Sequence, residues 1–266
     1  MTRAGPLLPL LPVLALVLVL GGCGGPAHKD GAPEGLPDYS NAPDAVPRVE
    51  KVSRAKQRPY TVLGRTYQPL KSSRGFVEQG VASWYGTKFH GRQTALGERY
   101  DMYSMSAAHK LLPLPTYVQV RNLENGRSAV VRVNDRGPFH SNRIIDLSYA
   151  AASKLGMLGK GTALVEVRAI DPGAPNASGQ LSSAVSSDTP VGKPRIYIQV
   201  GAFGDPGNAR RLQQRLQRHL SRSVLIENGG HVHRVQIGPL ASVESADLVI
   251  ARLREIDIHE TRMLLR

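Results

Sequence analysis

Three side chains that can exchange protons stand out between Gly80 and Phe139, where polar loops separate short apolar runs. Asp135 follows one apolar run and precedes Gly137-Pro138, so its carboxylate should project from a sharp corner of the chain. Glu98 belongs to a polar loop, and His109 follows two alanines. Carboxyl and imidazole groups on loops held by a rigid scaffold are the usual acids and bases of catalysis, so these three are our candidates.

Each candidate also has a purely structural interpretation. The Asp135 carboxylate could bond its own backbone in an Asx turn or pair with Arg136. Glu98 could be a solvated surface acid, and His109 could be a packed or capping histidine in the first turn of a short helix. The residue types alone leave these alternatives open.

Metal and cofactor chemistry find little support in the sequence. The histidines and acids follow no recognised zinc spacing such as His-Glu-x-x-His, although His231 and His233 form a His-x-His pair. Cys23 is the only cysteine, which rules out an internal disulfide and a cysteine nucleophile elsewhere in the chain. We therefore expect no metal and no cofactor.

Short strands should hold the candidates in place. Asn125-Gly126 between two alternating runs predicts a hairpin, and helices are expected from Ser106 to Leu111 and from Ser148 to Leu155. So many short strands with two single helices indicate a small β-barrel over residues 75–170. The expected strands are 81–85, 117–122, 129–133, 143–145 and 162–169.

The N-terminal segment predicts export and lipid anchoring. Arg3 precedes an apolar run from Leu7 to Leu20, which is short for a membrane-spanning helix and typical of a signal peptide over residues 1–22. Leu20-Gly21-Gly22-Cys23 resembles a bacterial lipobox, so Cys23 is the predicted lipidation site. Residues 23–74 read as a Pro- and Gly-rich spacer, and residues 171–193 as a second flexible, disordered linker.

An internal repeat marks residues 194–266 as a second domain. Gln199-Val-Gly201-Ala-Phe203 and Gln236-Ile-Gly238-Pro-Leu240 lie 37 positions apart, and each is followed by a helical apolar stripe. The resulting order β-α-β-β-α-β is that of a small α+β ferredoxin-like unit. An RNA-binding fold shares this topology, but the stacking aromatic residues that it needs are mostly missing.

The charge of the chain favours anionic partners without favouring nucleic acid. The formal net charge is +13, and the Lys and Arg residues are spread over both domains instead of forming one stripe. We expect diffuse attraction to anionic surfaces or polymers and no nucleic-acid partner.

Several segments resemble a known family. GVASWYG, FHGRQTALGE, AAHK, VRVNDRGPF and RIIDLSYAAA are similar to rare lipoprotein A, a family of septal-ring lytic transglycosylases with a double-psi β-barrel; the likeness extends from Gly80 to Ile170. QVGAF and RVQIGP resemble the SPOR domain, which binds septal peptidoglycan strands that lack stem peptides. The resemblance implies a mainly β double-psi barrel domain followed by a SPOR domain.

The resemblance also implies roles for the three candidates. The family's proposed catalytic acids correspond to Glu98 and Asp135, with His109 beside them to orient a carboxylate or tune its pKa. One acid would protonate the glycosidic oxygen between MurNAc and GlcNAc, and the C6 hydroxyl of MurNAc would attack its own C1 to form a 1,6-anhydro ring. The chain departs from the family at Leu96, where the family usually has Asn.

Further residues are candidates for glycan binding. In the first domain, Tyr85 could stack on a sugar ring, and Arg92 and Arg136 could bind polar sugar groups. In the second domain, strand alternation should turn the apolar side chains toward the helices and leave a polar face open as a saccharide platform. Its candidates are Tyr197, Gln199, Phe203, Arg234 and Gln236.

The function expected from these observations is endolytic cleavage of peptide-free peptidoglycan by a lytic transglycosylase at the division septum. The expected location is the cell envelope, with a lipid at Cys23 in the outer membrane, facing the periplasm, and division-septum proteins as possible partners. The alternative is a non-catalytic, expansin-like lipoprotein that binds peptidoglycan. Anhydro-ended products, or their absence, would separate the two.

Overall fold

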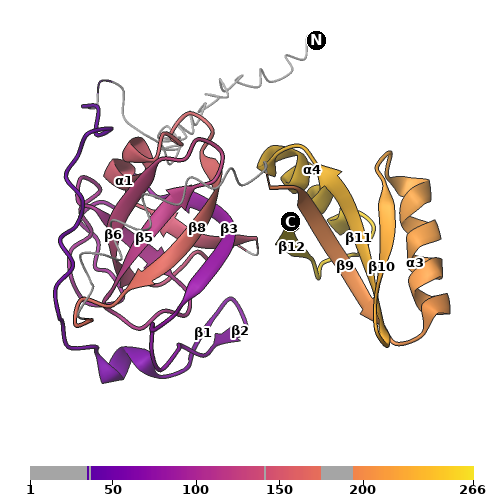
Figure 1. The fold of residues 1–266 in the computed structure, drawn as a ribbon, viewed down its shortest axis with the longest axis horizontal. Helices are drawn as coiled ribbons and strands as arrows, with labels where there is room; N and C mark the ends of the chain where they lie inside the picture. Colours follow the sequence, from indigo (N-terminus) through magenta and orange to yellow (C-terminus); the bar gives the residue numbers. More distant parts are fainter. Residues whose placement is uncertain (1–34, 36, 141, 175–193) are drawn as a thin grey trace, which may run out of the picture.

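The computed structural model describes residues 35, 37–140, 142–174 and 194–266, which form two units (Figure 1). The predicted signal peptide and Cys23 lie outside the described residues. Within the described part of the chain, no helix is long and apolar enough to span a membrane.

The first unit is a closed barrel whose strands run in the order β3-β7-β4-β6-β5-β8. The pairs β3–β7 and β4–β6 are parallel, and the other neighbours are antiparallel. Alternate residues of the strands, such as Val131 and Val133, fill the interior and are fully buried. The strands are β3 (Val77–Trp84), β4 (Ser106–His109), β5 (Thr116–Asn122), β6 (Ser128–Asp135), β7 (Arg143–Leu147) and β8 (Thr162–Ile170).

Among the residues that the structure describes, one α-helix accompanies the barrel, α1 (Tyr149–Lys154), and it agrees with the helix expected from Ser148 to Leu155. The Ser148 hydroxyl accepts a hydrogen bond from the Ala151 N–H, which caps the helix start. Gly156 follows its end with φ +67°, a conformation that glycine adopts without strain.

The helix expected from Ser106 is wrong, because Ser106–His109 forms strand β4. A run this short has little helical stability of its own. In the barrel, β4 instead pairs with β6 on one side and with β7 on the other, so tertiary pairing satisfies its backbone. Ala107 and Ala108 are buried there.

The described part of the expected spacer, residues 37–74, contacts the barrel through backbone hydrogen bonds such as those from Ser53 to Leu114 and from Leu70 to Leu111. We call residues 37–50 the N-terminal arm. The arm runs beside β6, where the Ala45 N–H donates to the Val130 carbonyl at 3.0 Å and the Val130 N–H donates to Asp44 at 2.9 Å. A 3-10 turn η1 (Arg54–Gln57) and a hairpin of β1 (Tyr60–Val62) and β2 (Arg65–Tyr67) follow.

The second unit has the predicted order β-α-β-β-α-β, with its four strands in one antiparallel sheet of order β10-β11-β9-β12. Asp205 caps α3 by accepting from the Asn208 N–H, and Ser242 caps α4 in the same way through Ser245. The elements are β9 (Ile196–Phe203), α3 (Pro206–His219), β10 (Val224–Gly229), β11 (Val232–Leu240), α4 (Val243–Arg254) and β12 (Arg262–Leu265).

Candidate active site

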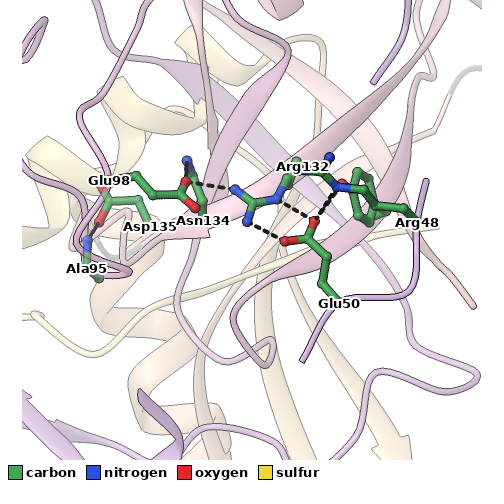
Figure 2. Close-up of polar contacts among 8 residues, drawn as sticks. Arg48, Glu50, Ala95, Glu98, Arg132, Asn134 and Asp135 are labelled. Carbon is green, nitrogen blue, oxygen red and sulfur yellow. Dashed lines mark hydrogen bonds and ion pairs between the residues drawn. The ribbon is translucent and has the colours of Figure 1, made fainter. Parts of the chain in front are cut away.

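The Asp135 carboxylate lies at the end of β6, where the chain turns away from the barrel wall. Its Oδ1 atom accepts a hydrogen bond from the backbone N–H of Ala95 at 2.7 Å (Figure 2) and another from the backbone N–H of Arg136 at 2.7 Å. Burial raises the pKa of Asp135, and this effect outweighs the two N–H donors and the nearby Arg136 charge, which lower it. Asp135 is therefore the carboxyl better suited to carry a proton.

The loop that carries Glu98 is docked on the same end of β6. Gln93 and Arg99 form an isolated bridge across the loop, and the Thr94 N–H donates to the Glu98 carbonyl at 2.7 Å. The Leu96 N–H donates to the Asn134 carbonyl, and the Leu96 side chain packs against the barrel core. The apolar residue at this position therefore anchors the loop through packing.

The Glu98 carboxylate has the opposite electrostatic setting from that of Asp135. Its Oε2 atom accepts from Arg132 Nη1 at 2.7 Å and from Asn134 Nδ2 at 2.8 Å. The Arg132 hydrogen bond is the largest effect on its pKa and lowers it, despite partial burial. Glu98 is therefore suited to remain ionised while Asp135 holds a proton.

A register shift in β6 separates the two acids. Arg132 and Asn134 bind Glu98, whereas the pairing of β4 with β6 passes from Val133 directly to Asp135, which lies opposite Ala108. Figure 2 shows the Glu98 carboxylate turned toward Asn134 and the Asp135 carboxylate turned toward Ala95.

The Arg132 guanidinium is held from its other side by the N-terminal arm. Arg132 Nε and Nη2 donate to the two oxygens of Glu50, both at 2.8 Å, in a bidentate pair. Tyr117 donates to the same carboxylate at 2.6 Å, and the Arg132 contact holds the pKa of Glu50 at about 2. The sequence reasoning missed Glu50 and Arg132. The alternation Arg132-Val-Asn134 was a usable signal, but nothing marked Glu50.

His109 is placed differently from the expectation. Its Nδ1 accepts the N–H groups of Leu111 and Leu112, so the proton is on Nε2, which faces Glu78 at 3.3 Å. The ring is 1% exposed, and burial lowers its pKa. Among the described residues, none of the side-chain hydrogen bonds of His109 reaches Glu98 or Asp135, so any influence on the carboxylates is indirect.

Arg136 supplies the indirect connection. Its Nη1 donates to the backbone carbonyls of His109 and Leu112, and its Nη2 donates to that of Lys56. The guanidinium also lies 5.6 Å from the centre of the Tyr60 ring. Arg136 therefore joins β4, the loop after it and the segment before β1 next to Asp135.

The other residues expected to bind sugars in the barrel differ in exposure. Tyr85 is 7% exposed and stacks on Tyr100 with ring centres 4.1 Å apart, so its ring faces are not open for a sugar. Burial also raises the pKa of Tyr85. Arg92 is exposed and lies 5.8 Å from the Phe89 ring, which is itself exposed. Of the two aromatic pairs, Arg92 with Phe89 is therefore the one that a sugar can reach, whereas Tyr85 with Tyr100 is buried.

The predicted open face of the second unit is partly closed. Tyr197 is 9% exposed beneath Arg266, and Gln236 is 1% exposed and donates to Glu227, which also pairs with Arg266. Gln199 and Arg234 remain partly exposed.

Phe203 lies on the other side of the sheet. The pairing of β9 with β11 shifts register between Val235 and Gln236, and this bulge reverses the side-chain alternation. Phe203 therefore packs near Leu212 against the core of the second unit instead of joining the polar face.

Within the described ranges, no group of three or more His, Cys, Asp and Glu side chains is arranged to hold a metal ion.

Comparisons with known proteins place these features in a family. Residues 77–167 match a family model described as lytic transglycolase, and residues 192–259 match the SPOR domain. A Pseudomonas aeruginosa protein named endolytic peptidoglycan transglycosylase RlpA is 42% identical, with 82% of this chain and 79% of that protein covered. The protein of the same name from Vibrio cholerae is 40% identical, with 91% of both chains covered. The chain belongs to the RlpA family.

Membership of the RlpA family confirms the expected architecture, a double-psi β-barrel followed by a SPOR domain. The lytic transglycolase match contains Glu98, His109 and Asp135, together with Arg132 and Asn134, which hold Glu98. The RlpA relatives are also similar beyond the barrel, since the alignment with the Vibrio cholerae protein spans nine tenths of this chain.

Proposed function

We propose that this protein is an endolytic peptidoglycan transglycosylase, which cleaves MurNAc–GlcNAc bonds in peptide-free strands and leaves 1,6-anhydroMurNAc ends. The names of its relatives support the reaction class. The observation that carries the proposal is the pair of carboxyls at the end of β6 whose pKa values are shifted in opposite directions, up for Asp135 and down for Glu98.

Asp135 acts as the general acid. Its raised pKa keeps a larger protonated fraction at a given pH, and it donates this proton to the glycosidic oxygen as the bond to C1 breaks. The resulting carboxylate then accepts the proton of the MurNAc C6 hydroxyl, which attacks C1 of the same sugar. Because the nucleophile belongs to the substrate, the high effective molarity of an intramolecular reaction replaces a bound water.

Glu98 supplies negative charge to the same step. The oxocarbenium-like transition state carries positive charge near C1, which a fixed carboxylate stabilises. Arg132 and Asn134 hold Glu98 in one orientation, so little reorganisation is needed during the reaction.

His109 acts as a positioning residue for the acid. Its buried ring orders the chain after β4 through the Leu111 and Leu112 N–H groups, and its carbonyl accepts from Arg136, the neighbour of Asp135. The link to Asp135 therefore runs through backbone and Arg136.

The SPOR domain directs the barrel to septal peptidoglycan. Gln199 and Arg234, two partly exposed polar residues of its sheet, contact the glycan. A lipid on Cys23 holds the protein in the outer membrane, facing the periplasm and the septal proteins.

Mass spectrometry of digested peptide-free glycan tests this proposal. The wild-type protein should give anhydro-ended products that Asp135→Asn lacks, while Glu124→Gln, which removes a surface carboxylate paired with Lys160, should retain them. Reducing ends derived from water would indicate a hydrolase instead. Undiminished binding without any product would favour the non-catalytic, expansin-like alternative.

A further inference from the structure

A pocket of about 820 Å³ lies between the N-terminal arm and the outer face of the barrel, beside Glu98. Its arm wall contains Tyr39, and its barrel wall contains Tyr103 and Asn134. Asp135 does not line it. The pocket therefore lies on the Glu98 side of the candidate site and extends away from Asp135.

The arm wall of this pocket is fixed to the barrel at several points. The Tyr39 N–H donates to the Ser153 hydroxyl at 3.1 Å, and Lys154 bonds both the Ala42 carbonyl and the Asp44 carboxylate. Beyond the pocket, Glu50 holds Arg132 by two hydrogen bonds. These contacts place the arm as a wall of defined position.

The lining has the composition of a site for a neutral, hydroxyl-rich ligand. Tyr103 is 38% exposed, so part of its aromatic surface stays open at the rim beside Tyr39, whose ring centre lies 5.7 Å away. Four acids and three arginines line the pocket, so its net charge is small.

We propose that the pocket between the N-terminal arm and the barrel is a saccharide subsite, which takes a glycan sugar next to the scissile bond on the Glu98 side. This inference rests on the proposed function, since it names where the same glycan strand continues beyond the carboxyls. The arm is then part of the enzyme's substrate cleft.

Kinetics with peptide-free glycan oligomers of defined length test the subsite in the full chain. In the wild type, kcat/KM should rise when the oligomer gains the sugar that reaches the pocket. Tyr103→Ala and Tyr39→Ala should each remove this rise, with a loss of roughly 3- to 10-fold carried mainly by KM. Tyr39→Phe keeps the ring and should behave as the wild type, as should Val49→Ala, a change at an arm residue that is 77% exposed and does not line the pocket. A wild-type length dependence in both alanine variants would overturn the proposal.

A spectroscopic measurement keeps the subsite testable without turnover and without reliance on Tyr39, which also contacts Tyr149 in the folded chain. A fluorinated tyrosine placed at the exposed position 103 in Asp135→Asn should show a saturable ¹⁹F shift with the same oligomers. Glycan bound at the SPOR domain leaves this signal unchanged. A saturable shift with no product from the wild type would retain the subsite and reject the proposed reaction, whereas product formation without any shift would reject the subsite.

Discussion

Asp135 accepts a hydrogen bond from the Ala95 N–H at 2.7 Å, and this contact joins the end of β6 to the loop that carries Glu98. The two acids lie 37 positions apart in the chain, yet a single backbone contact ties the position of one to the loop of the other. The same contact lowers the pKa of Asp135, while burial raises it by more. Small changes in the loop should therefore alter both the geometry and the acidity of the site.

Replacement of the acid should separate chemistry from folding. Asp135→Asn should lower the rate of anhydro-product formation by at least about 100-fold, because an amide donates no proton. Its carbonyl oxygen can still accept from Ala95 and Arg136, so the fold should persist. Ionisation of Asp135 costs more in the folded state than in the unfolded state, so stability is lost as the pH rises from the ordinary value of 3.8 through the raised pKa. Thermal unfolding at neutral pH should therefore show a melting temperature equal to or above that of the wild type, and a large decrease would contradict this account.

The pH dependence of activity should show whether Asp135 is the proton donor and Glu98 the ionised carboxylate. The rate should fall on the alkaline side as Asp135, with its raised pKa, loses its proton, and on the acidic side as Glu98, with its lowered pKa, becomes protonated. Glu98→Gln should lose the acidic limb and keep the alkaline one. The pH dependence of kcat/KM, measured for the wild type and for Glu98→Gln, checks this assignment of roles. Loss of the alkaline limb in Glu98→Gln would instead make Glu98 the acid and Asp135 the ionised group.

The arm should contribute a pH-dependent part of the stability. The pKa of Glu50 is lowered from its ordinary value to about 2, so its contribution is present above pH 4.5 and is lost as the pH falls toward 2. Glu50→Gln should flatten this part of the curve of unfolding free energy against pH. Glu255→Gln, at an exposed ion pair, is the matched control and should leave the curve unchanged.

Replacement of His109 should mainly lower the stability of the fold, and should lower activity as a consequence. His109→Ala removes the acceptor of two buried N–H groups and should lower the free energy of unfolding by about 1–3 kcal/mol. His109→Asn offers an amide oxygen at a similar place and should recover part of both stability and activity. An Asn variant as stable as the wild type but inactive would indicate a direct role of the imidazole.

The SPOR surface should depend on its exposed residues. Arg234→Ala and Gln199→Ala should weaken co-sedimentation with peptide-free sacculi while the domain stays folded, because both side chains are partly exposed. Gln236→Ala should lower stability instead, since this buried amide donates to Glu227. Equal binding by all three variants would place the glycan on another surface.

Local sequence patterns predicted most strands but not the details that long-range contacts decide. The Asn125-Gly126 hairpin and the Ser148 helix are set by turn and capping residues close in sequence, and both are present. For Ser106–His109 the local pattern predicted a helix, and the pairing with β6 and β7 made the segment a strand instead.

In the candidate site, too, local motifs indicated some residues, while long-range contacts decided their partners. Motif position indicated Asp135 and Glu98, whereas the partner of His109 is Glu78, 31 positions earlier, and that of Arg132 is Glu50, 82 positions earlier. No periodicity reports contacts over such separations. The closed part of the SPOR face has the same origin, because Arg266 and a β-bulge determine which side chains stay exposed.

The docking of the arm shortens the segment between the barrel and the predicted lipidation site at Cys23. With the lipid at Cys23 that the sequence predicts, only 15 peptide steps separate the anchor from Asp38, near the first contacts of the arm with the barrel. At full extension that tether covers about 50 Å, whereas a free segment up to residue 74 would cover about three times as much. The barrel would therefore sample glycan close to the anchoring leaflet, and inserted residues before position 37 should extend its range into the wall.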